Sequence, residues 1–146
     1  MDPFTISTGV AGFLGLGIQI AQILTRYISE VKTAPDDTKA LLTEITALNS
    51  VLTQLTEFLE TNDISAEFNE VSALTSVIGM CQKNIQDMYK KLSILRRDKK
   101  WGVNMDQLKW PFEKKECVEL AVRLNRFAQI MQFSLTISNW YFSLCL

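Results

Sequence analysis

The sequence predicts an all-α protein, an up-and-down four-helix bundle formed by a single domain over residues 1–146. Apolar residues recur every three or four positions in four separate stretches, which is the spacing of one face of an α-helix. No stretch of the sequence alternates apolar and polar residues as a half-buried strand would. With 146 residues, 47% of them hydrophobic, the chain is long enough for one compact core. Short connections between amphipathic helices favour antiparallel neighbours with shallow crossing angles.

The first predicted helix spans about residues 4–31 and is apolar and rich in glycine. Its segment from Phe4 to Leu24, FTISTGVAGFLGLGIQIAQIL, contains no charged side chain. Each glycine disfavours a helix by roughly 1 kcal/mol relative to alanine, so this segment needs packing partners to stay helical. Its apolar row is Ile6, Val10, Phe13, Gly17, Ile20, Leu24, Tyr27 and Val31.

The second and third predicted helices span about residues 36–61 and 68–97. Pro35, Asp36 and Asp37 are favourable start signals for the second helix. Basic residues at the end of the third helix favour its C-terminus, where the helix dipole is negative. The apolar rows are Leu41, Ile45, Leu48, Leu52, Leu55 and Leu59 in the second helix, and Leu74, Ile78, Cys81, Ile85, Met88, Leu92 and Leu95 in the third.

The last predicted helix spans about residues 111–140 and follows a longer loop, about residues 98–111. Pro111 is acceptable in a first helical turn. We expect Trp101 or Trp110 to fold back over the end of the bundle, because large aromatic rings are seldom left in water. The final NWYFSLCL is expected to dock on the bundle as a last helical turn; an exposed apolar tail is the alternative. The apolar row is Leu120, Leu124, Phe127, Met131 and Leu135.

The first helix has two interpretations, because opposite its apolar row it carries only small or neutral residues as far as Arg26. It is either a core helix wrapped by the other three, or an element that can enter a membrane. About 21 helical residues extend roughly 32 Å, close to the hydrocarbon thickness of a bilayer. Ala11 with Gly15, and Gly17 with Ala21, have the small-xxx-small spacing of helices that associate in lipid. Because a permanent span would uncover three apolar rows, we favour a helix that is stored in the bundle and able to leave it.

Charge is distributed unevenly along the sequence. Residues 57–70 are acidic, with Glu57, Glu60, Asp63, Glu67 and Glu70 and no base, whereas residues 90–115 are strongly basic. In an up-and-down bundle these two connections lie at opposite ends, so the domain is predicted to be electrically bipolar. The basic cluster fits anionic lipid, with a solubilising helix end as the alternative. It comprises Lys90, Lys91, Arg96, Arg97, Lys99, Lys100, Lys109, Lys114 and Lys115.

The composition argues against several classes of protein. A net charge of −1 disfavours nucleic-acid binding, and the absence of histidine removes the commonest general base and metal ligand. The three cysteines are far apart and include no CxxC pair, which disfavours a zinc site and a disulfide framework. Asp2 and Pro3 at the start disfavour a secretory signal. We therefore expect no catalytic site, no metal and no cofactor.

Three segments also carry a resemblance: MDPFTISTGVAGFLGLGIQIAQIL, LLTEITALNSVLTQLTEFL, and LKWPFEKKECVELAVRLNRFAQIMQFSLTI with its KWPF turn at Lys109 to Phe112. Together they resemble the HeLo-like N-terminal domains of fungal NOD-like receptor (STAND) proteins, over essentially the whole chain. These are similar in architecture to the HeLo domain and to the four-helix bundle of the mixed-lineage kinase-like executioner of necroptosis. Unlike most members, this chain shows no P-loop and no amyloid signalling motif.

The resemblance implies a cytoplasmic bundle that targets the plasma membrane when clustered by a receptor or amyloid-type partner, and causes regulated cell death. The implied partners are anionic membrane lipids and further copies of the chain in an oligomer, with no nucleic acid. The alternative is a protein-interaction (adaptor) module that recruits a partner without touching lipid. The implied membrane-insertion helix carries over to Phe4, Ile6, Val10, Gly12, Phe13, Leu14, Gly15, Leu16, Ile18, Ile20, Ile23 and Leu24, with the basic cluster as the anionic-lipid patch.

Overall fold

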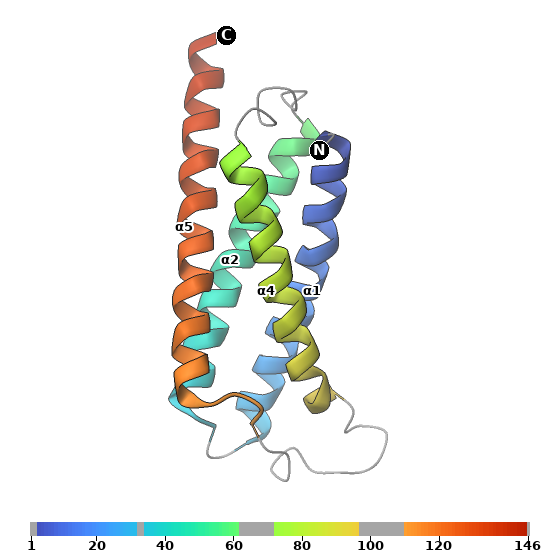
Figure 1. The fold of residues 1–146 in the computed structure, drawn as a ribbon, viewed down its shortest axis with the longest axis vertical. Coiled ribbons are helices and arrows are strands. Elements are labelled where there is room, and N and C mark those ends of the chain that lie inside the picture. The colour runs from blue at the N-terminus through green and yellow to red at the C-terminus, as the bar shows by residue number, and fades with distance from the viewer. Residues whose placement is uncertain (1–2, 32–33, 62–71, 97–109, 146) are drawn as a thin grey trace.

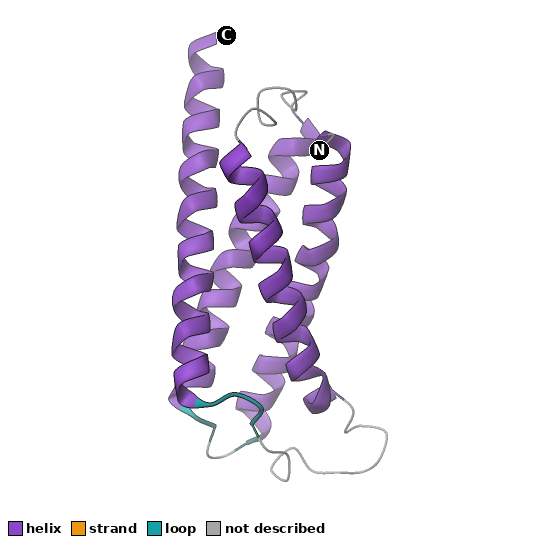
Figure 2. Ribbon diagram, viewed as in Figure 1, coloured by secondary structure: helices purple, strands orange, loops and turns teal. Residues whose placement is uncertain are grey.

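The described residues form four helices that alternate in direction along the chain (Figure 1). Two of the pairs that pack together, the first helix with the third and the second with the fourth, are parallel, whereas the sequence predicted antiparallel neighbours. A computed structural model of the chain describes residues 3–31, 34–61, 72–96 and 110–145. The helices are α1 (Pro3–Glu30), α2 (Asp36–Thr61), α4 (Ser72–Arg96) and α5 (Lys114–Cys145). They run up and down side by side, with the N-terminus, the end of α2 and the start of α4 at one end of the bundle (Figure 1). Figure 2 shows that helices account for nearly all of the described chain, and no strand occurs among these residues.

The helices do not contact one another equally. The most extensive contacts join α1 to α2 and α2 to α5, followed by α1 to α4, whereas α4 and α5 touch at few points. Polar contacts do not follow this order. Across the α2–α5 seam, Asn125 donates a hydrogen bond of 3.1 Å to Glu44. Across the α4–α5 seam, Arg123 donates a longer one of 3.5 Å to Asn84. By the extent of its helix contacts, the bundle is therefore closed along three seams and loose along the fourth.

The predicted apolar rows form one continuous core. Leu41, Ile45, Leu48 and Leu52 of α2 are fully buried, and the rows of α1, α4 and α5 join them in a single cluster. Leu59 packs against that cluster while partly exposed, and the side chains of Ile6 and Leu74 lie outside the described residues. Burial of such rows is the main favourable contribution to folding in a bundle of this kind.

The start of α5 differs from the prediction. The helix begins at Lys114 rather than near Pro111, and the amide of Cys117 donates its first hydrogen bond, of 3.0 Å, to the carbonyl of Glu113. Residues 110–113 stay out of the helix while Phe112 is buried and Trp110 packs partly against the core. Packing of these two rings therefore outweighs the helical start that the proline favours.

The other boundaries agree closely with the sequence, apart from the C-terminus. α1 ends at Glu30, α2 has the predicted limits, and α4 ends at Arg96; its expected start at residue 68 lies outside the described residues. α5 continues to Cys145 instead of ending near residue 140, and its last turns extend beyond the ends of the other three helices (Figure 1). These last turns therefore do not pack on α1, α2 or α4, and the expected docking is wrong.

Among the glycines of α1, only Gly17 is needed for a close approach between described residues. A Cβ at Gly17 would lie 2.2 Å from Oδ1 of Asn49 in α2, whereas a Cβ at Gly9, Gly12 or Gly15 would meet nothing within 4 Å. The Asn49 oxygen is buried and has no hydrogen-bond partner among the described residues. The α1–α2 seam is thus too close at Gly17 to accommodate a larger residue without movement of Asn49.

This difference predicts opposite effects of two alanine substitutions in the same helix. Gly15→Ala should raise the free energy of unfolding by about 0.5–1 kcal/mol, because alanine restricts the unfolded chain and has open space. Gly17→Ala should lower it by roughly 1 kcal/mol, because the new methyl group overpacks the seam. Chemical denaturation followed by circular dichroism measures both. In an Asn49→Ala background Gly17→Ala should become stabilising; an unchanged effect there would contradict the packing explanation.

Candidate functional site: the first helix and the basic end of the bundle

The buried face of α1 holds many of the large residues of the predicted insertion helix. Val10, Phe13, Ile20, Ile23 and Leu24 belong to the core, and Leu14 and Leu16 are half-buried. The side chains of Phe4 and Ile6 lie outside the described residues. In this structure most of these apolar groups therefore contribute to the bundle and are not displayed to a membrane.

The outward face of α1 is exposed and uncharged, which corrects the expectation of a central helix wrapped on most sides. α1 packs mainly on α2 and α4 and lies at the side of the bundle (Figure 1). Gly12, Ile18, Gln19 and Gln22 are exposed, and Ile18 keeps 46% of its surface in solvent. Small residues leave a shallow groove of about 490 Å³ beside this face, lined by Ile18, Ala21, Gln22, Thr25, Arg26, Ser29, Thr46 and Asn49.

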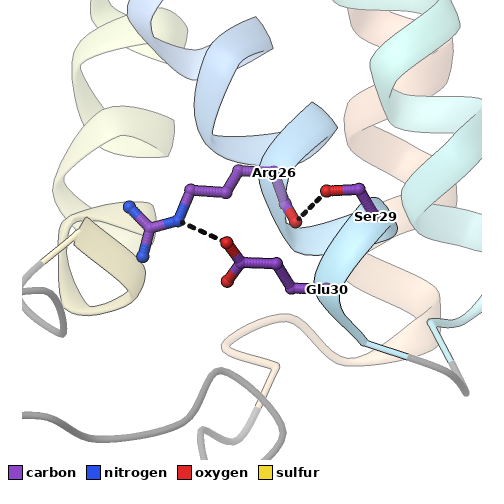
Figure 3. Close-up of polar contacts among 3 residues, drawn as sticks. All are labelled: Arg26, Ser29 and Glu30. Carbon is purple, nitrogen blue, oxygen red and sulfur yellow. Dashed lines mark hydrogen bonds and ion pairs between the residues drawn. The ribbon is translucent and has the colours of Figure 1, made fainter.

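Charge enters the described part of α1 only near its C-terminal end. Nε of Arg26 lies 3.5 Å from Oε1 of Glu30, one helical turn later, and the Ser29 hydroxyl donates a 2.9 Å hydrogen bond to the Arg26 carbonyl (Figure 3). Such pairs four residues apart stabilise a helix only slightly, but they neutralise both charges locally. Before this pair, α1 has no charge from Pro3 to Thr25.

One described helix has the length and composition of a membrane span. It is the stretch Gly9–Glu30 of α1, 22 residues long, and 28% of the 18-residue window that qualifies it is buried in the bundle. Twenty-two helical residues extend about 33 Å, enough to cross the hydrocarbon layer. The core helix of a soluble protein meets the same test, so the length alone does not separate the two interpretations of α1.

An aromatic cluster, formed by Tyr27, Trp110 and Phe112, ties the end of α1 to the segment that precedes α5. The Trp110 ring lies 5.0 Å from the Tyr27 ring and 5.5 Å from the Phe112 ring, between centroids, and both pairs are tilted. Such pairs add to the apolar area that they bury. The prediction that a tryptophan folds back over the bundle is confirmed for Trp110; Trp101 lies outside the described residues.

The structure brings part of the predicted lipid patch to one end of the bundle. Lys90 and Lys91, near the end of α4, and Lys114 and Lys115, at the start of α5, are exposed at the end opposite the N-terminus of α1 (Figure 1). The side chain of Arg96 and all of Arg97, Lys99, Lys100 and Lys109 lie outside the described residues.

This end is less uniformly basic than the sequence predicted. Lys91 forms an ion pair with Glu116 across the α4–α5 seam, and its ammonium lies 5.2 Å from the centre of the Phe112 ring. The hydrogen bond from Lys91 holds the pKa of Glu116 below its usual range. Asp36 and Asp37, in the first turn of α2, lie at the same end (Figure 1). The sequence could not show this mixture, because Asp36 and Asp37 are distant from the basic cluster along the chain and the pairing of Glu116 with Lys91 joins two different helices.

The loose α4–α5 seam contains a groove of about 450 Å³ that the sequence did not predict. Apolar side chains of Met88, Phe112 and Leu120 form part of its lining. Its polar lining has both signs of charge. Among the described residues, no cluster of three or more acidic residues and cysteines is arranged to hold a metal ion. The polar residues are Asn84, Asp87, Lys90, Lys91, Glu116, Glu119 and Arg123.

Cys81 and Cys117 are buried core thiols. Burial raises the pKa of Cys81 to about 12, and burial is also the main reason that the pKa of Cys117 is raised. Because the thiolate is the reactive form, both cysteines are shielded from alkylation in the closed bundle.

These features define the class of the molecule, an all-α four-helix bundle domain with an apolar first helix. Residues 1–136 match the family described as Pigment biosynthesis cluster protein PigL N-terminal, and the chain belongs to this family. The matched range contains α1, α2 and α4 whole and most of α5. Neither a curated protein nor a solved structure matches the chain significantly.

The aromatic cluster predicts a stability effect. Trp110→Ala should lower the free energy of unfolding by roughly 2–3 kcal/mol, because it removes a large, partly buried ring that joins α1 to the start of α5. Trp110→Phe keeps a ring in place and should cost less than half as much. Chemical denaturation of the two variants measures both losses of unfolding free energy. Equal losses would show that packing of the ring is not the cause.

The Lys91–Glu116 pair predicts a pH dependence with a definite sign. Because the pKa of Glu116 is lowered in the folded state, the pair adds stability above the ordinary glutamate pKa and loses it as the pH falls through the lowered value. Carbon-detected NMR titration of Glu116 should give a midpoint below that of an ordinary glutamate. Lys91→Met should shift this midpoint upward, and an unshifted midpoint would exclude Lys91 as the cause.

Proposed function

We propose that this domain is a cell-death effector that, when clustered, targets membranes and permeabilises them by inserting α1. The observation that carries the proposal is the outward face of α1, which is exposed yet has no charge before Arg26. The exposed faces of α2, α4 and α5 include charged residues, as expected for helices that meet only water. The PigL family description names no activity, so the proposal rests on these residues and on the resemblance to HeLo-like domains.

The energetics favour storage of α1 at rest and release on activation. In the bundle, Val10, Phe13, Ile20 and Leu24 are in an apolar environment, and acyl chains would provide another. Departure of α1 would expose the apolar rows of α2 and α4 to water, at a cost of about 25 cal/mol per Å². Clustered copies could cover those rows for one another. The domain is accordingly proposed to be cytoplasmic at rest and to reach the plasma membrane when a receptor or amyloid-type partner clusters it.

The proposal includes a first contact between the bilayer and the basic end of the bundle. Lys90, Lys114 and Lys115 are exposed and can contact anionic headgroups, each adding about 1 kcal/mol near the surface. They lie at the end of the bundle opposite the N-terminus of α1 (Figure 1). A rigid bundle docked by this end would hold the start of α1 away from the membrane. Insertion therefore requires α1 to leave α2 and α4, and to break the contact of Tyr27 with Trp110.

The test is a charge placed in the middle of the uncharged face. Gly15→Glu should leave the fold intact, since a Cβ there meets nothing within 4 Å and glutamate favours helix more than glycine. An acidic residue at the centre of a span costs about 3 kcal/mol, equivalent to a loss of roughly 100-fold in insertion. Leakage of dye from anionic vesicles, with the protein clustered through a fused multimerising tag, should fall accordingly.

Gly79→Glu is the matched control, because Gly79 is an exposed glycine of α4 with nothing within 4 Å of an added Cβ. It adds the same carboxylate away from α1 and should leak like the wild type. Alkylation of Cys81 during leakage should rise with release of α1, because the thiol is buried in the closed bundle. Wild-type leakage by a folded Gly15→Glu variant, or sealed vesicles with the clustered wild type, would contradict the proposal.

A second candidate is the adaptor module that recruits a protein partner without touching lipid. It is favoured by the exposed apolar side chains on α5, which include Phe133 with 68% of its surface in solvent. In the same vesicle assay this candidate predicts no leakage from any variant.

A further inference from the structure

A second exposed apolar surface lies on the outside of α5, apart from α1. Large apolar side chains that keep between 44% and 68% of their surface in solvent are unusual for a helix that already has a buried row. We call them the outer α5 face: Val118, Val122, Ile130, Phe133 and Ile137.

These residues share one side of the helix. At about 100° per residue they fall within roughly a third of the helix circumference, nearly opposite the buried row that contains Leu124 and Met131. The main contacts of α5 are with α2, and those with α4 are few. α5 therefore has two apolar sides, of which the bundle uses one.

The outer α5 face has an internal symmetry. Its centre lies between Phe127 and Ala128. Val122 and Phe133 are equally far from this centre on opposite sides, and so are Val118 and Ile137. Arg126 is related to the neutral Gln129 by the same centre. A helix that meets an antiparallel copy of itself about this centre therefore places Val122 at the height of Phe133, Val118 at the height of Ile137, and Arg126 at the height of Gln129. Ile130 lies outside this symmetry, because the residue at its height is Asn125.

We propose that the outer α5 face binds a second copy of this chain, with the two α5 helices antiparallel and Val122 of one against Phe133 of the other. A parallel pair in register would place Arg126 against Arg126 and Glu119 against Glu119, and such like-charge contacts are unfavourable. Antiparallel pairing about a two-fold axis avoids both contacts and gives a closed dimer. In this dimer Arg126 of one copy can hydrogen-bond to Gln129 of the other. If lipid covered the face instead, acyl chains would leave both side chains without partners.

The size of the surface predicts a weak dimer. The stretch from Val118 to Ile137 extends about 30 Å, and one pair of helices of that length buries an area near the lower limit of specific interfaces, roughly 1,000 Å² in total. Association of this kind depends on concentration, as clustering requires. The inference deepens the proposed function, since it names the surface for self-association; its test uses no lipid, so its failure is distinguishable from a failure of α1 insertion.

The first experiment measures association in solution by sedimentation equilibrium. Phe133→Asp should raise the dissociation constant at least tenfold, because it replaces the most exposed apolar side chain of the face with a charge at its contact with Val122. Ile94→Asp is the control: Ile94 is 51% exposed on α4, away from the outer α5 face, and its substitution should leave association unchanged. Circular dichroism checks that both variants fold. Wild-type protein that stays monomeric at millimolar concentration would overturn the proposal.

The second experiment tests the register by disulfide crosslinking in a Cys145→Ser background. Positions 122 and 133 of one chain are three turns apart, about 16 Å, too far to be bridged within the chain. A mixture of Val122→Cys and Phe133→Cys proteins should therefore crosslink between copies, while Val122→Cys alone should not. Crosslinking of Val122→Cys alone would show parallel pairing and overturn the proposed arrangement. Loss of vesicle binding in Phe133→Asp with unchanged association would assign the face to lipid and overturn it also.

Discussion

The packing of α1 against α2 and α4 is the interaction on which the rest of this bundle depends. α1 contributes one apolar face to the core, and it packs closely on α2 where Gly17 meets Asn49. Removal of α1 would leave two helices with uncovered apolar rows. The same helix has the only stretch of the described chain with the length and composition of a membrane span. α1 therefore both stabilises the closed bundle and has the length and composition to enter a membrane.

Two kinds of contact oppose the departure of α1. Apolar burial acts along its length, whereas at its C-terminal end Tyr27 packs on Trp110, which in turn contacts Phe112. The α4–α5 seam is different, because it has few contacts and contains a groove bridged by the Lys91–Glu116 pair. This seam is connected to α1 through Phe112, which lines the groove and contacts Trp110.

The sequence anticipated the helices well because burial requires a spacing of three and four residues. The rows through Leu48, Ile85 and Leu124 are all buried as predicted. It was less successful at the last helix, since the local preference of Pro111 for a first turn is weaker than the packing of Trp110 and Phe112. It also missed the outer α5 face, because apolar residues on two sides of one helix blur its periodicity.

The sequence by itself determined the fold class, the four apolar rows and the uncharged character of residues 4–24, because these follow from residue type and spacing alone. Only the tertiary structure decided which faces remain in water. It placed α1 at the side of the bundle, paired Lys91 with Glu116, and left Phe133 exposed. The physical reason is that exposure and ion pairing depend on which helices become neighbours, and residues far apart in the chain determine that choice.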